Sequence, residues 1–244
     1  GATHKVLVYD VLDNDCTEAR ARFASDSVAR DFSQVLLREH QSKMLDFLRN
    51  SVVRPELAGV SGGLFENWMH NVLPRGGRFR VRRLNPTPLD GGDPRYVVLP
   101  VLREVDVQVV DDLKPPGDGG SIYFHPTGGN FPALDALAQG NFPALEALDD
   151  VSDTAFSSTI GLQATVSRHH PLKTARVVEI LNRLNVTAAG RFDLFFVVWP
   201  ASFDAFGEQN YLNVDGRVAR ALPGQISRAV TQWALELPIA EPAD

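Results

Sequence analysis

The sequence predicts an α/β fold in which a mixed β-sheet is flanked by helices. Apolar residues recur at helical spacing both before and after a series of short runs in which apolar and polar residues alternate like strands. Residues 192–199 form instead a continuous apolar run, which is typical of a central strand covered on both faces. Helices interspersed with strands of this kind favour a layered α/β arrangement.

The composition fits one large globular domain, or one domain with a small appendage. The chain has 244 residues, of which 44% are hydrophobic and 22% are charged, and these are ordinary values for a protein with a core. No apolar run approaches the roughly 20 residues that cross a bilayer, so no membrane partner is expected. Cys16 is the single cysteine, which excludes an internal disulfide framework and a cysteine zinc site.

The N-terminal part predicts a strand and then a long helix. Residues 4–9 read as a strand, and apolar spacing indicates a helix from Ser25, a capping residue, to about Asn50. Glycines then break the chain before a second amphipathic helix at residues 64–73.

The second helix carries two polar residues beside its apolar stripe. Glu66 and His70 are four residues apart, so they share one helix face. His70 is expected to form a hydrogen bond and not to bind a metal.

The remaining elements are expected to be mainly short strands. Strand candidates lie at residues 78–84, 96–99, 103–110, 121–125, 160–167, 192–199 and 232–237, with a helix at 174–184. The first of these strands places Arg78, Arg80 and Arg82 on one face. That face is either a solvated surface or a phosphate-contacting one, since planar guanidinium groups match phosphate oxygens. Because the net charge is −6, nucleic-acid binding requires such a local basic face.

A near-perfect internal duplication occupies the centre of the chain. The sequence NFPALDAL at 130–137 is repeated as NFPALEAL at 141–148, and each copy carries one carboxylate, Asp135 or Glu146. Gln163 follows in an apolar strand candidate, and a cationic cluster that ends at Lys173 comes next. Acid, polar strand residue and lysine in this order indicate a metal-dependent phosphodiesterase site. The alternatives are a carboxylate on an exposed helix turn and a glutamine on the solvent face of a strand.

Five motifs in this order resemble one family. They lie at residues 63–70, 76–79, 123–135, 162–173 and 195–211. Together they are similar to the C-terminal region of the Crinkler effectors of oomycetes and fungi, which is related to the retrotransposon hot spot proteins of trypanosomes. The resemblance covers roughly residues 57–237. It implies a restriction-endonuclease-like core of the PD-(D/E)xK class, preceded at 1–56 by a helical tail of another module. The sequence at 238–244 itself predicts a disordered tail.

The resemblance also implies a function and a set of site residues. The expected function is that of a secreted virulence effector that enters the host nucleus and hydrolyses phosphodiester bonds of host DNA with Mg²⁺ or Mn²⁺. The implied catalytic residues are Glu66, Asp135, Glu146, Gln163 and Lys173; the metal ligands are Glu66 with Asp135 or Glu146; the nucleic-acid contacts are Arg78, Arg80, Arg82 and Arg168.

One departure from the family pattern leaves a second function open. Thr165 stands where the strand motif has a lysine, so Lys173 is the candidate replacement. Gln163 carries no charge, and an uncharged amide holds a metal weakly. The alternative function is therefore a catalytically inactive nuclease fold that binds DNA or a host protein.

Overall fold

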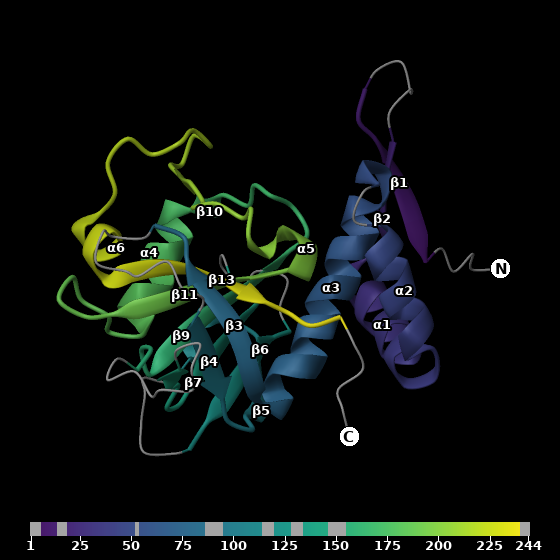
Figure 1. The fold of residues 1–244 in the computed structure, drawn as a ribbon. Coiled ribbons are helices and arrows are strands. Elements are labelled where there is room, and N and C mark those ends of the chain that lie inside the picture. Colours follow the sequence, from purple (N-terminus) through teal and green to yellow (C-terminus); the bar gives the residue numbers. More distant parts are fainter. Residues whose placement is uncertain are drawn as a thin grey trace.

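The computed structural model describes residues 6–13, 19–51, 54–85, 95–113, 120–127, 134–145 and 155–239 (Figure 1). The helices are α1 (Asp26–Glu39), α2 (Gln41–Ser51), α3 (Ala58–Val72), α4 (Thr174–Arg183), α5 (Pro200–Phe203) and α6 (Gly224–Ala229), with 3₁₀ turns at Pro55–Leu57, Leu73–Arg75 and Val110–Asp112. The strands are β1 (Leu7–Val11), β2 (Ala19–Phe23), β3 (Gly77–Arg83), β4 (Arg95–Leu99), β5 (Arg103–Val107), β6 (Ile122–Pro126), β7 (Ala136–Gln139), β8 (Ala144–Leu145), β9 (Thr159–Thr165), β10 (Leu172–Lys173), β11 (Phe192–Val198), β12 (Tyr211–Leu212) and β13 (Val230–Glu236).

A large mixed sheet organises the molecule. Within the described residues it has nine strands in the order β5-β6-β7-β9-β11-β13-β3-β4-β8. Its centre, β9, β11 and β13, is parallel, whereas β7 and β3 run antiparallel to their inner neighbours. Every residue of β11 is buried, as the continuous apolar run predicts. The α/β fold with a mixed sheet flanked by helices is therefore confirmed.

Two short links show that this sheet is strongly curled. Strands β7 and β8 stand six positions apart, and in a flat sheet that separation would be about 29 Å. The link of residues 140–143 spans at most about 18 Å. Residues 100–102 similarly join β4, near one end of the sheet, to β5 at the other end. The sheet must therefore roll so that its two ends approach each other.

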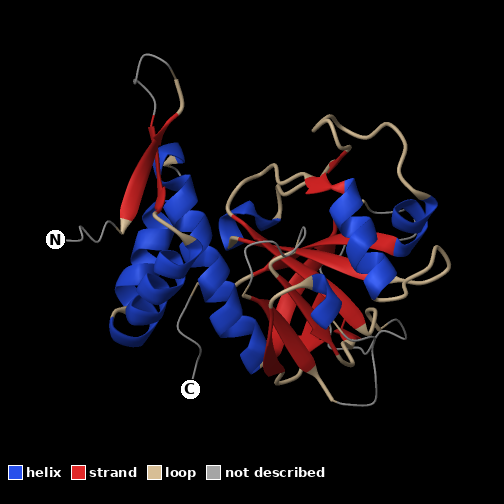
Figure 2. Cartoon of the chain, turned by 180° about the vertical axis from the view of Figure 1, so that it is seen from behind, coloured by secondary structure: helices blue, strands red, loops and turns tan. Residues whose placement is uncertain are grey.

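Helices cover both faces of the sheet, and Figures 1 and 2 show α3 between the sheet and the α1–α2 pair. One apolar cluster joins the N-terminal elements, α3 and one face of the sheet, and it includes Phe23, Leu48, Trp68 and Trp233. A second cluster lies under α4 and α6 on the other face. Because the first cluster is continuous, the N-terminal helices share a core with the rest of the described chain.

The helices differ from the sequence prediction in two places. Ser25 caps α1 as expected, with its hydroxyl oxygen accepting the Val28 N–H at 3.2 Å, but His40 divides the predicted helix into α1 and α2. Helix α3 begins at Ala58 and runs through the glycines that were expected to break the chain. A Cβ on Gly59 would stand 2.8 Å from the Ala21 carbonyl oxygen, so this glycine allows β2 to approach the helix closely.

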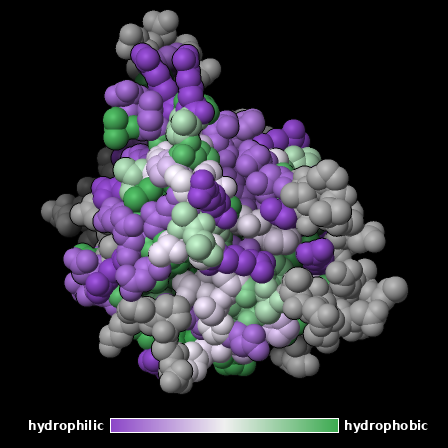
Figure 3. All heavy atoms as spheres, turned by 90° about the vertical axis from the view of Figure 1, so that its left-hand side faces the viewer, coloured by the Kyte–Doolittle hydropathy of each residue, from purple (hydrophilic) through white to green (hydrophobic). Residues whose placement is uncertain are grey.

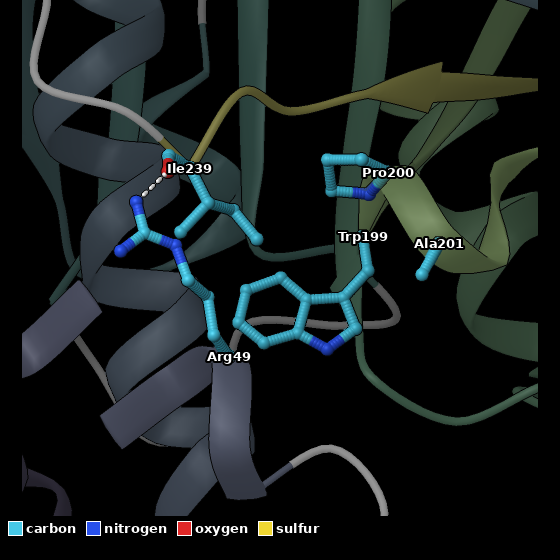
Figure 4. Close-up of a pocket in the computed structure, with 5 residues that line it drawn as sticks. All are labelled: Arg49, Trp199, Pro200, Ala201 and Ile239. Carbon is cyan, nitrogen blue, oxygen red and sulfur yellow. Dashed lines mark hydrogen bonds between the residues drawn. The ribbon is translucent and has the colours of Figure 1, made fainter. Parts of the chain in front are cut away.

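Residues 238 and 239, which were predicted to belong to a disordered tail, are held by hydrogen bonds in the structure. The Pro238 carbonyl accepts the indole N–H of Trp68 at 2.9 Å, and the Ile239 carbonyl accepts the Arg49 guanidinium at 2.5 Å. Arg49 and Ile239 also line a pocket of about 290 Å³ (Figure 4). These two hydrogen bonds hold the end of the described chain against α2 and α3. Residues 240–244 lie outside the described part of the chain.

None of the described helices combines the length and apolar character that a membrane span requires. Figure 3 shows hydrophilic side chains over much of the visible face, with hydrophobic residues scattered among them. Scattered exposed apolar residues of this kind are normal on protein surfaces.

Candidate functional site

Asp135 and Gln163, which are distant in sequence, meet where β7 begins beside β9. The Asp135 N–H donates to the Leu162 carbonyl at 3.0 Å and so ties the acid to β9. Its Oδ2 atom accepts the Gln163 amide Nε2 at 2.7 Å and the Ala164 N–H at 2.7 Å. Because this segment enters a strand and Gln163 is only 6% exposed, the helix-turn and solvent-face alternatives are wrong.

The Asp135 carboxyl is electrostatically unusual. Burial raises the pKa of Asp135 well above its ordinary value, and the nearby Glu66 carboxylate raises it further. The hydrogen bonds from Ala164 and Gln163 oppose this shift, since they favour the charged form. A partly buried carboxyl with a raised pKa is either protonated or in need of a cation, and such groups cluster at functional sites.

Glu66 approaches this carboxyl from α3 together with His70. Glu66 Oε1 lies 3.8 Å from His70 Nε2, and the other ring nitrogen of His70 forms a 2.8 Å hydrogen bond with the Tyr123 hydroxyl. Tyr123 lies on β6 and is fully buried, and burial followed by the Asp135 charge raises its pKa well above the usual value. The expected hydrogen-bonding role of His70 is confirmed, and it fixes the imidazole between a buried phenol and the helix acid.

His125, also on β6, adds a second imidazole that sequence reasoning did not select. Its ring centroid lies 4.0 Å from that of His70, and its Nδ1 lies 3.7 Å from Oδ1 of Asp106. Burial, then the charge of His70, lowers the pKa of His125 to about 4. His125 is therefore neutral near pH 7. The sequence feature that could have identified His125 is its position in the motif at 123–135, two residues after Tyr123.

This histidine predicts a loss of stability in acid. The pKa of His125 is 6.5 when exposed and about 4 when folded, so between these values the unfolded chain binds a proton that the folded chain refuses. The contribution of neutral His125 to the free energy of unfolding is complete above pH 6.5. It is lost as the pH falls toward 4, by roughly 3 kcal/mol in total. Urea unfolding of the wild type and of His125→Gln across this range measures the difference. A wild-type decline no steeper than that of the variant would contradict it.

The structure does not bring Lys173 to Asp135 and Gln163. Lys173 is exposed in β10, which pairs with β12 in a separate two-stranded sheet, opposite Leu212. Among the described residues, no hydrogen bond or ion pair connects it to either site residue. Thr165, at the lysine position of the motif, carries no positive charge. The site as described therefore lacks the cation that the resemblance implies.

Arg168 lies on the loop after β9, and Gln209 fastens that loop. The Gln209 side-chain amide donates to the Arg168 carbonyl at 3.1 Å, and its oxygen accepts the His170 N–H at 2.5 Å. The backbone N–H of Gln209 donates in turn to the side-chain Oε1 of Gln232 on β13, at 2.8 Å. The Arg168 side chain is exposed, and its contact with nucleic acid stays a prediction.

Arg80, expected as a phosphate contact, is engaged within the protein. Its guanidinium forms ion pairs with Asp204 at 3.1 Å and with Glu236 at 3.2 Å, and it lies 4.5 Å from the ring centroid of Phe203. These partners belong to α5, the turn that follows it and β13. Arg80 therefore fastens α5 to the sheet, which favours a structural role over the phosphate-contacting one.

Arg82 has a similar role on the same strand face. Its guanidinium donates to the Phe203 carbonyl at 2.9 Å and to the Phe206 carbonyl at 2.5 Å, and burial lowers its pKa. Arg78 lies 4.0 Å from the ring centroid of Tyr96. The predicted basic face therefore exists, but Arg82 is committed to internal acceptors, as Arg80 is.

The predicted metal ligands are only partly visible. Glu146, the alternative acid of the duplication, lies outside the described residues. Within the described ranges, no cluster of three or more His, Cys, Asp or Glu side chains is arranged to hold a metal ion. What remains of the expected set is the pair formed by Asp135 and Glu66.

Comparison of the chain with protein-family models, with curated proteins and with solved structures finds no match. The similarity to the Crinkler effectors therefore stays a prediction based on the motifs. What the described residues establish is an α/β fold in which a half-buried carboxyl and a glutamine meet near two histidines, a tyrosine and a helix glutamate.

Proposed function

We propose that this chain is a metal-dependent nuclease with a restriction-endonuclease-like core, a secreted effector that hydrolyses phosphodiester bonds of host DNA. One observation carries the proposal: the half-buried Asp135 carboxyl accepts a 2.7 Å hydrogen bond from Gln163 and interacts electrostatically with Glu66. Three residues selected from sequence thus converge, although they are spread over nearly a hundred positions. Packing alone gives no reason to place two partly buried acids close to each other.

The order of elements around these residues supports the same proposal. Asp135 enters β7, which runs antiparallel to β9, and β9 carries Gln163. Helix α4 then leads to β11, which is parallel to β9, and Glu66 comes from α3 on the adjoining face. Glu66 and Gln163 lie on regular elements and Asp135 immediately precedes one, and such elements hold catalytic groups more precisely than loops do.

The two carboxyl groups suit a hard divalent cation. Oxygen ligands from one or two carboxylates are typical of Mg²⁺ sites, and Mn²⁺ accepts the same donors. Asp135 and Glu66 would hold the ion, while His70, fixed by Tyr123, keeps Glu66 oriented. A bound ion polarises the phosphoryl oxygen and lowers the pKa of water. The Gln163 nitrogen faces Asp135, so its amide must turn for the oxygen to join the ligands.

Metal uptake should raise stability in a pH-dependent manner. Saturating Mn²⁺ at about a hundred times its dissociation constant would add about 2.7 kcal/mol, because the folded chain alone offers the site. Since Asp135 has a raised pKa, the ion must displace its proton, and affinity should increase with pH. Calorimetric titration at several pH values tests this expectation, with Asp135→Asn as the variant that should take up no Mn²⁺.

Nicking of supercoiled plasmid tests the function itself. The wild type should convert plasmid to the open circular form with Mg²⁺ or Mn²⁺ and should stop when the ion is chelated. Glu66→Gln should slow the conversion, whereas Glu39→Gln, on the exposed surface of α1, should not. A wild type that leaves plasmid intact with either ion would overturn the nuclease proposal.

A second candidate function is a catalytically inactive fold that binds DNA or a host protein. It is favoured by the position of Lys173, which is exposed in a separate sheet while Thr165 occupies the motif position. This function predicts DNA binding without Mn²⁺ uptake, and the affinity should fall steeply with salt if phosphates are the contacts. An affinity that does not change with salt would indicate a protein partner.

A further inference from the structure

We propose that Arg30, on helix α1, supplies the cationic side chain of this site and contacts a phosphate of the bound nucleic acid. The inference rests on the proposed function and adds a residue that the sequence motifs do not include. It also assigns a role to the N-terminal helices, which the family resemblance treats as the end of another module.

Close packing of two helices brings Arg30 to the site. A Cβ on Gly63 of α3 would lie 4.0 Å from the Cβ of Ala29, so α1 and α3 cross closely at this point. Arg30 is the next residue on α1, and Glu66 lies three residues after Gly63 on α3. The crossing therefore places the arginine beside the helix face that bears Glu66 and His70.

The environment of Arg30 agrees with this placement. Arg30 shares a face of α1 with Ser33, which is fully buried, and with Leu37, which packs against the core. The side chain is itself half-buried, and its charge contributes to the field at His125. The charge of Arg30 therefore acts on the pair formed by His70 and His125.

The Arg30 guanidinium has no hydrogen bond or ion pair among the described residues. Other arginines of the N-terminal segment do have partners: Arg22 binds Asp10 at 2.6 Å and Arg38 binds Glu39 at 2.8 Å. A half-buried charge without a partner is costly, and an anionic ligand would compensate it. Phosphate, like carboxylate, accepts two parallel hydrogen bonds from a guanidinium, and phosphate is the anion that nucleic acid presents.

The chemistry of the site needs this charge. Glu66 lies beside His70 and Asp106 beside His125, and the Asp135 carboxyl interacts with Glu66, so the field that a phosphate meets is largely negative. Thr165 does not supply a cation, and Lys173 lies in the separate β10–β12 sheet. A positive side chain from α1 offsets the repulsion during binding, and it stabilises the charge that develops on the phosphoryl group.

The salt dependence of DNA binding tests the role of Arg30. The full chain would be titrated against a short fluorescein-labelled duplex, with Ca²⁺ replacing Mg²⁺, over a series of KCl concentrations. In Arg30→Ala the slope of log K against log salt should become shallower by about 0.9, the contribution of one phosphate contact. Affinity at low salt should fall about tenfold. Arg30→Lys should keep most of the slope.

Arg38→Ala is the matched control, because Arg38 lies on the same helix with its side chain 74% exposed. Its slope should equal that of the wild type. An unchanged slope in Arg30→Ala, with wild-type thermal stability, overturns the proposal and leaves the nuclease function intact. A shallower slope in a protein that does not nick plasmid supports the phosphate contact and overturns the nuclease function. A wild type that binds no duplex overturns both.

Discussion

Asp135→Asn is expected to reduce plasmid nicking by about 10³-fold, because the amide cannot neutralise a divalent cation and several kcal/mol of transition-state stabilisation are lost. Nicking by the variant at the wild-type rate would show that another acid holds the ion. Glu39→Gln is the control, since it removes an exposed carboxylate remote from β7 and β9.

The same substitution should have the opposite effect on stability. The folded pKa of Asp135 is raised, so its contribution to stability is complete below the unfolded pKa and is lost as pH rises through the folded pKa. The asparagine has no such loss, and without metal the variant should be the more stable protein at high pH. Urea unfolding over a pH series measures the difference. Lost activity with gained stability identifies a group retained for function.

Asp193→Ala should lower the free energy of unfolding by about 3–5 kcal/mol. Asp193 is completely buried at the start of β11, where it accepts the Trp233 indole N–H at 2.8 Å and the Ser157 N–H at 2.7 Å. Its ion pair with Arg191 measures 3.1 Å. Alanine leaves both buried donors without an acceptor and the arginine without its partner.

Urea unfolding of three variants separates these contributions. Asp193→Asn keeps an acceptor for the indole and should cost less than alanine. Arg191→Ala removes a partner whose side chain is 46% exposed, and it should cost no more than about 1 kcal/mol. A cost for Asp193→Ala below that of Arg191→Ala would show that the buried network contributes little.

The features that local pattern could predict are the ones that depend on neighbours in sequence. The apolar run at 192–199 became the buried central strand β11, and the helix expected at 174–184 became α4. Ser25 caps α1 because its hydroxyl meets an N–H three residues later. Asp135 and Gln163 were selected because each interrupts an apolar run, and burying such a residue requires a partner.

The features that escaped prediction depend on contacts between distant segments. The glycines of α3 read as a break because nothing local reveals that β2 approaches Gly59. The alternation of Arg80 and Arg82 along the strand predicts a solvated or phosphate-binding face. Their actual hydrogen-bond acceptors lie more than 120 residues away in sequence, so no local pattern reveals them. Tyr123 and His125 were not selected from the sequence, because what sets them apart is their contact with His70 on another element.

The position of β13 has a consequence for how the chain is made. This strand is the last of the main sheet to leave the ribosome, yet it lies between β11 and β3, and β3 is the earliest strand of that sheet. Until residues 230–236 emerge, β3 has an unpaired edge and the growing chain cannot close its core. Nascent chains of this protein should therefore depend on chaperones that shield exposed strands during synthesis.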